Sequence, residues 1–82
     1  MLGGLFVKSL KVSLSMAESV KNFVNVVGKY PYDIDLRSGR FVIDAKSLLG
    51  IFSLDLSKPI VLEIYSDKCD DLIAELAPFI VK

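Results

Sequence analysis

Histidine is missing from the 82-residue sequence, cysteine occurs once, and the formal net charge is zero. The single thiol, Cys69, excludes an internal disulfide, which favours a reducing cytoplasm. Because no histidine can activate it, Cys69 is expected to be a structural thiol. Ten basic side chains against ten acidic ones argue against nucleic acid or an anionic membrane as the main partner. We therefore expect the partner to be a protein, or the chain to have no large partner.

Motifs for catalysis and metal binding are missing as well. No glycine-rich phosphate loop, zinc-ligand spacing or nucleophile–base pair occurs, so we expect neither an enzyme nor a cofactor or metal. Asp67, Asp70 and Asp71 lack the glycine turn and the distal glutamate of a calcium loop. These carboxylates are better explained as charges at the start of a helix, where the macrodipole favours them.

Length and apolar content indicate one packed domain. The sequence is 52% apolar, which favours a globule over a disordered chain. Residues 1–7 are apolar but carry no basic leader, and they are too short for a signal peptide or a membrane span. We expect a flexible N-terminal extension over residues 1–7 and a single folded domain over residues 8–82.

Periodicity predicts four strands and three helices. Ser15 and Glu18 match a capping box at the start of the first helix, whose apolar stripe begins with Met16. Gly28 is suited to a left-handed cap at the end of that helix. The predicted elements are a strand at 10–14, a helix at 16–27, hairpin strands at 32–36 and 41–45 around a Ser-Gly turn, a helix from 47 to 54, a strand at 60–65 and a helix from 67 to 80.

The order β-α-β-β-α-β-α predicts the architecture. Four strands with one apolar face need a cover, and three helices with one apolar stripe each can supply it. We therefore expect an α+β fold with a four-stranded antiparallel sheet, three helices on one face, and the other face open to water.

Function is expected at the junction between the hairpin and the second helix. Ser47 is placed to begin that helix, where its hydroxyl can cap free backbone N–H groups. Five of the seven residues from 48 to 54 are large and apolar, more than one face of a short helix can hide. We expect Leu48 and Leu49 to be partly exposed as a contact patch, and Ile51 and Phe52 to belong to the core.

The segment from Lys46 to Leu54 is similar to the signature around the regulatory serine of HPr, the small phosphocarrier of the bacterial phosphoenolpyruvate-dependent sugar phosphotransferase system. Lys29-Tyr30, the segment 33–36 and the element order also resemble that family, from about Lys8 to Ile80. The resemblance implies an HPr-like open-faced β-sandwich over residues 8–82 and phosphorylation of the serine by a dedicated kinase. It implies that Leu48 and Leu49 help to contact partner proteins, and we name Lys46 and Phe52 as further candidates for protein binding.

The sequence departs from that family at the phosphate acceptor. The family carries phosphate on a histidine at the start of the first helix, followed two and three residues later by arginine and proline. Counting back from Lys29 puts Met16 in the acceptor position, with Glu18 and Ser19 in place of arginine and proline. A thioether cannot accept a phosphoryl group, and the carboxylate would repel one.

Two functions from different classes follow. The first is an HPr-like protein related to sugar uptake that is unable to carry phosphate on histidine and acts as a regulatory or protein-binding partner through the Ser47 helix. Its partners would be an HPr-type kinase or other proteins of sugar regulation, in the cytoplasm. The alternative is a small-ligand-binding or dimerisation module unrelated to sugar transport. For Ser47 itself, a regulatory phosphorylation site and a simple helix cap stay open as alternatives, and the sequence does not fix the oligomeric state.

Overall fold

The computed structural model describes residues 7–81, so most of the extension expected at residues 1–7 lies outside the described residues. A four-stranded sheet, three α-helices and one short 3₁₀ turn make up the fold. In chain order these are β1 (Lys8–Val12), α1 (Ala17–Val27), β2 (Asp33–Ser38), β3 (Phe41–Asp44), α2 (Leu48–Phe52), β4 (Ile60–Tyr65), α3 (Asp70–Glu75) and the 3₁₀ turn η1 (Ala77–Phe79).

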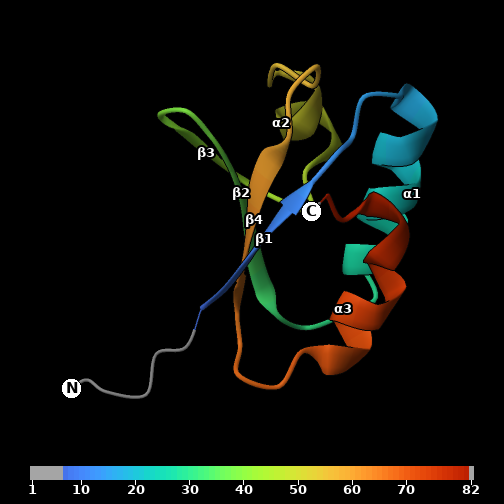
Figure 1. Ribbon diagram of the computed structural model, residues 1–82, viewed down its shortest axis with the longest axis vertical. Helices are drawn as coiled ribbons and strands as arrows, with labels where there is room; N and C mark the ends of the chain where they lie inside the picture. The colour runs from blue at the N-terminus through green and yellow to red at the C-terminus, as the bar shows by residue number, and fades with distance from the viewer. Residues whose placement is uncertain (1–6, 82) are drawn as a thin grey trace.

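All neighbouring strands of the sheet are antiparallel, in the order β1-β4-β2-β3. The three helices lie on one side of the sheet (Figure 1), which confirms the predicted α+β architecture. Leu62 at the centre of β4 faces Leu10 of β1 and Leu36 of β2, so apolar side chains from three strands meet beneath the helices. Leu10 is partly buried against this core, and the buried residues besides Leu36 and Leu62 are Val12, Leu14, Val20, Phe23, Val27, Ile34, Ala45, Ile51, Ile60, Ile64, Cys69, Leu72 and Leu76.

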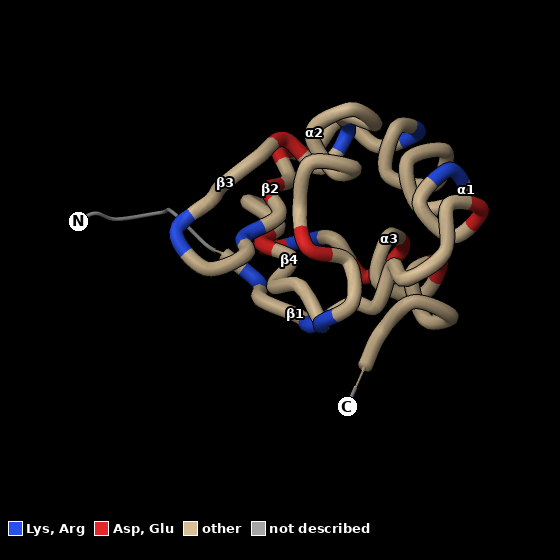
Figure 2. The backbone as a smooth tube through the Cα atoms, turned by 90° about the horizontal axis from the view of Figure 1, so that it is seen from above, with Lys and Arg blue, Asp and Glu red and all other residues tan. Residues whose placement is uncertain are grey.

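The outer face of the sheet is polar, as expected for an antiparallel sheet with one face in water. Arg37 of β2 pairs with Glu63 of β4 at 3.1 Å on this face. Basic and acidic residues both occur along the strands (Figure 2), so neither sign dominates the sheet. The strand β1 is also joined by the C-terminal segment, because Val81 N–H donates to the Lys11 carbonyl at 2.8 Å and Val12 bridges Ile80.

The start of the first helix differs from the prediction. No capping box forms, because α1 begins at Ala17 and its N-cap is Met16, which makes no side-chain cap bond. Burial of Val20 and Phe23 fixes the rotation of α1 about its axis and turns Met16 into solvent, where 64% of its surface is exposed. Tertiary packing of the helix therefore outweighs the local capping preference of Ser15.

The end of α1 and the first strand also differ. Gly28 is right-handed, with φ −65° and ψ −18°, because Lys29 and Tyr30 continue the turn with N–H bonds to the carbonyls three residues back. The glycine that needs a positive φ is Gly39 in the hairpin turn, at 59°. The strand β1 begins at Lys8 and ends at Val12, two residues earlier than predicted.

Candidate functional site

Ser47 stands between β3 and α2 and caps the helix, as predicted. Its backbone is extended, with φ −97° and ψ 105°, and its Oγ accepts a hydrogen bond from Gly50 N–H at 3.1 Å. Gly50 permits this contact, because a Cβ at that position would lie 3.0 Å from the Ser47 Oγ. The serine and the glycine therefore form one local unit.

The residues before Ser47 hold the junction in place. Asp44 accepts two backbone hydrogen bonds, from Lys46 N–H to its side chain at 2.8 Å and from Ser47 N–H to its carbonyl at 3.0 Å. The Lys46 ammonium donates to the Tyr30 carbonyl at 2.8 Å and is partly buried. Lys46 thus ties the junction to the segment after α1, and its role in protein binding stays a prediction.

The apolar side chains of α2 divide between core and solvent. Ile51 is fully buried, whereas Leu48, Leu49 and Phe52 expose 39%, 84% and 44% of their surface. The expectation of exposed leucines is confirmed, and the expectation that Phe52 belongs to the core is wrong. A helix of five residues turns only one side to the sheet, and Ile51 occupies it. We call Leu48, Leu49 and Phe52 the α2 patch.

Met16 lies at the beginning of α1, which contacts α2. The first turn of α1 and the helix α2 are at the same end of the molecule (Figure 1). The Met16 side chain adds an exposed apolar surface to that end but offers no atom that could accept a phosphoryl group. Glu18 in the first turn of α1 is exposed as well.

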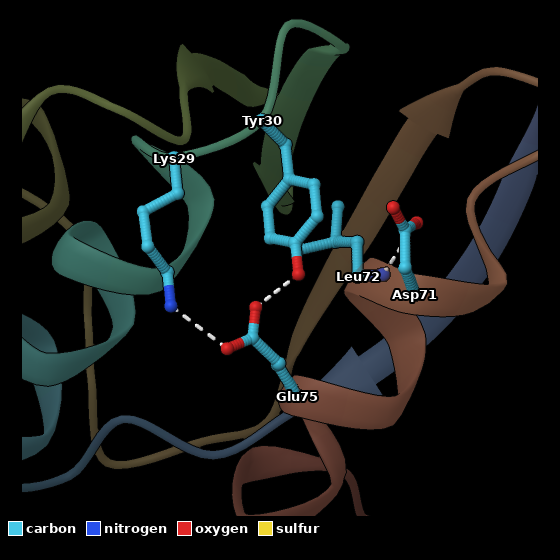
Figure 3. A network of polar contacts seen from close by, with 5 residues as sticks. All are labelled: Lys29, Tyr30, Asp71, Leu72 and Glu75. Atoms are coloured by element: carbon cyan, nitrogen blue, oxygen red, sulfur yellow. Dashed lines mark hydrogen bonds and ion pairs between the residues drawn. The ribbon is translucent and has the colours of Figure 1, made fainter.

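The Lys29-Tyr30 pair quoted for the resemblance fastens α1 to α3. Lys29 Nζ lies 2.7 Å from Glu75 Oε1, and the Tyr30 hydroxyl donates to Glu75 Oε2 (Figure 3). The bond to Glu75 raises the pKa of Tyr30 to about 12, and the bonds from Lys29 and Tyr30 lower the pKa of Glu75. Sequence reasoning missed Glu75, because its partners are 45 and 46 residues away.

A second tyrosine extends this contact between the layers. Tyr32 stacks on Tyr30 with ring centroids 5.8 Å apart, and its hydroxyl donates to the Lys68 carbonyl at 2.8 Å and to Asp71 at 3.1 Å. Tyr32 also lines a surface hollow of about 540 Å³ together with Asp33, Ile34, Asp35, Asp44, Lys46 and Tyr65. The neighbouring carboxylate of Asp35 raises the pKa of Tyr65.

Three other features within residues 7–81 bear on function: the cysteine thiol, the possible metal ligands and the length of the helices. Burial raises the pKa of the Cys69 thiol, which is enclosed in the core and donates weakly to the Ser66 carbonyl at 3.8 Å. Over the same range, no group of three or more histidine, cysteine, aspartate or glutamate side chains lies close enough together to bind a metal ion. None of the helices described there is long and apolar enough to cross a membrane.

Solved structures of HPr proteins share this fold. No protein-family profile and no curated protein matches the sequence. The phosphocarrier protein HPr from Bacillus anthracis superposes with a TM-score of 0.70 at 22% identity, covering 96% of this chain and 100% of its own. HPr-C-His from Thermoanaerobacter tengcongensis gives a TM-score of 0.67 at 23% identity, covering 93% of this chain and 89% of its own. The chain therefore has an HPr-like fold.

Proposed function

We propose that this protein is an HPr-like regulatory partner of the sugar phosphotransferase system that binds other proteins through the α2 patch and carries no phosphate on histidine. The α2 patch is the observation that supports docking most directly. Three apolar side chains of one short helix remain in solvent, directly after the capped Ser47. Adjoining exposed apolar side chains of this kind are typical of protein contact sites.

Loss of phosphate transfer rests on the start of α1. Met16 occupies its N-cap, the place where the resemblance puts the acceptor histidine, and the sequence offers no histidine elsewhere. The general phosphotransferase enzyme with phosphoenolpyruvate should leave the protein unlabelled. The variant Met16→His with Glu18→Arg and Ser19→Pro should gain acid-labile phosphate, and labelling of the unmodified protein would refute this part of the proposal.

Regulation at Ser47 is the second part of the proposal. A phosphate on its Oγ would add about two negative charges next to the exposed Leu48 and Leu49. A partner that docks an apolar surface there would have to bury this charge, which costs binding energy unless it supplies a cation. Phosphorylation would therefore change which proteins bind the patch. Incubation with an HPr-type kinase and ATP should add one phosphate to the peptide that contains Ser47.

The decisive experiment is affinity capture from the native cytoplasm with matched variants. Leu49→Ser removes the most exposed member of the patch and should lose the phosphotransferase-system partners that the unmodified protein retains. Ser47→Asp should change the set of partners, whereas Ser47→Ala should not, because it adds no charge. A control, Val7→Ser, removes an exposed apolar side chain outside the patch. Identical partners for all variants would overturn docking through α2.

A further inference from the structure

The two edges of the sheet are not alike. The edge of β1 is covered by the C-terminal segment, through the Val12–Ile80 bridge and the hydrogen bond from Val81 to Lys11. The strand β3 pairs only with β2 among the residues described. In both views β3 lies on the side of the molecule away from α1 and α3 (Figures 1 and 2). Its outer edge therefore lacks a covering element within residues 7–81.

The backbone of Val42 points toward this open edge. Ala45 N–H donates to the Ile34 carbonyl at 2.9 Å, which marks that pair as hydrogen bonded. Hydrogen-bonded pairs alternate along an antiparallel ladder, so Ile43 is bonded to Leu36 of β2 and Val42 is not. The N–H and C=O of Val42 are directed away from β2 and can accept a further strand.

The side chains along β3 are unusual for an open edge. Phe41 and Val42 expose 65% and 45% of their surface. Lysine, proline and bulges, three of the devices that stop an edge from pairing, are missing from β3, whereas its length of four residues and the charge of Asp44 limit the pairing. Arg40 and Asp44 flank the apolar run from Phe41 to Ile43, and neither joins the two ion pairs found within residues 7–81.

We propose that a second copy of this chain pairs antiparallel with β3 about a twofold axis through Val42. Each Val42 then exchanges N–H and C=O bonds with the Val42 of the second copy. Residues two positions either side of the axis face each other, so Arg40 meets Asp44 of the second copy and Asp44 meets its Arg40. Phe41 lies opposite Ile43 of the second copy on the other face of the joined sheet.

Self-complementary charge identifies the occupant of the edge. Read outward from Val42, a cation lies in the turn just before β3, at Arg40, and an anion at the last residue of β3, at Asp44, so an inverted copy of the segment 40–44 matches both ends. A partner strand of one charge sign would match only one end. Because β3 is four residues long, the interface is small and the dimer is weak and concentration dependent.

Sedimentation equilibrium from about 10 µM to about 1 mM tests the proposal, since a weak interface populates in that range. The unmodified protein should pass from monomer to dimer, with slower hydrogen exchange at the Val42 amide. Val42→Lys places two cations opposite each other on the axis and should weaken the dimer at least tenfold. Its circular dichroism spectrum should not change, because Val42 lies on the solvent face of the sheet.

Charge-reversal variants of Arg40 and Asp44 test the register in which the two β3 strands pair. Arg40→Asp and Asp44→Arg should each weaken self-association about tenfold, because like charges then face each other twice. An equimolar mixture of the two variants should recover association, because the acidic residues at positions 40 and 44 of one variant then face the arginines at positions 44 and 40 of the other. If Asp44→Arg fails to fold, the self-association of Arg40→Asp and of Val42→Lys still tests the proposal. The proposal is overturned if the unmodified protein stays monomeric or if the Val42→Lys variant still forms the dimer. Binding of some other strand to the β3 edge would not rescue it. Leu49→Ser should leave the dimer intact, which separates this result from docking through the α2 patch.

Discussion

Replacing Ser47 by alanine removes one hydrogen bond whose effect can be estimated from the structure. The Ser47 Oγ accepts from Gly50 N–H at 3.1 Å at the start of a helix of five residues. Loss of such a cap costs about 1 kcal/mol of the free energy of unfolding. In a domain of this size that corresponds to a melting temperature lower by about 4–8 °C.

Aspartate at the same position separates capping from signalling. Ser47→Asp keeps a side-chain oxygen that accepts from the helix N–H groups, and aspartate caps as well as serine. Its melting temperature should therefore stay close to that of the unmodified protein, while its charge alters docking at the α2 patch. An alanine variant that melts within about 1 °C of the unmodified protein would show that the bond to Gly50 adds nothing to stability.

A double-mutant cycle with Gly50→Ala tests the same contact from the other side. Alanine gains about 1 kcal/mol of helix propensity, but its Cβ would lie 3.0 Å from the Ser47 Oγ and 3.3 Å from Ile43 Cδ1. Such crowding costs about 1–3 kcal/mol, so Gly50→Ala should destabilise. In the Ser47→Ala background the closest contact is gone, and the cost of Gly50→Ala should fall by about 1 kcal/mol. Additive effects, measured by urea unfolding, would contradict the close approach.

Further predictions concern the core and the tyrosine contact. Ile51→Ala should lower the free energy of unfolding by about 2–5 kcal/mol, because Ile51 is fully buried, whereas Phe52→Ala should cost much less, as chemical denaturation can measure. Glu75→Gln should bring the pKa of Tyr30 from about 12 back toward 10.0, as seen by ultraviolet absorbance of tyrosinate. Because the pKa of Glu75 is lowered from 4.5 and that of Tyr30 is raised, the contact stabilises between these limits. The difference in melting temperature between Glu75→Gln and the unmodified protein should therefore shrink as the pH falls below about 4.5 or rises above about 10.

Patterns with a strict period predicted the fold well. Alternation placed β4 at the residues where it is found, and the helical stripe of Val20, Phe23 and Val27 is buried as expected. Ser47 was found as a cap because its signal is local, a serine directly before an apolar run. Exposure of Leu48 and Leu49 followed from counting apolar residues against the one face a short helix can bury.

Features that depend on contacts between distant segments could not be predicted in this way. The start of α1 depends on how Val20 and Phe23 pack, so the capping box around Ser15 gave the wrong cap. Phe52 looked like a core residue by its type, although Ile51 is the residue of α2 that is buried and Phe52 keeps 44% of its surface exposed. The pairing of Glu75 with Tyr30 joins α3 to the end of α1, and no local pattern carries that information.

Asp44 connects the two proposed interaction surfaces. Its N–H belongs to the open edge of β3, while its carbonyl and side chain accept the hydrogen bonds that orient Ser47 and Lys46. Pairing of β3 with a second copy would draw Asp44 toward an arginine and fix the geometry on which the Ser47 cap depends. Binding free energies are reciprocal, so a change at Ser47 that shifts Asp44 must alter dimerisation by the same factor by which dimerisation alters the state of Ser47. One dimer would also carry two α2 patches, and a partner with two matching sites would bind it far more tightly than one patch allows.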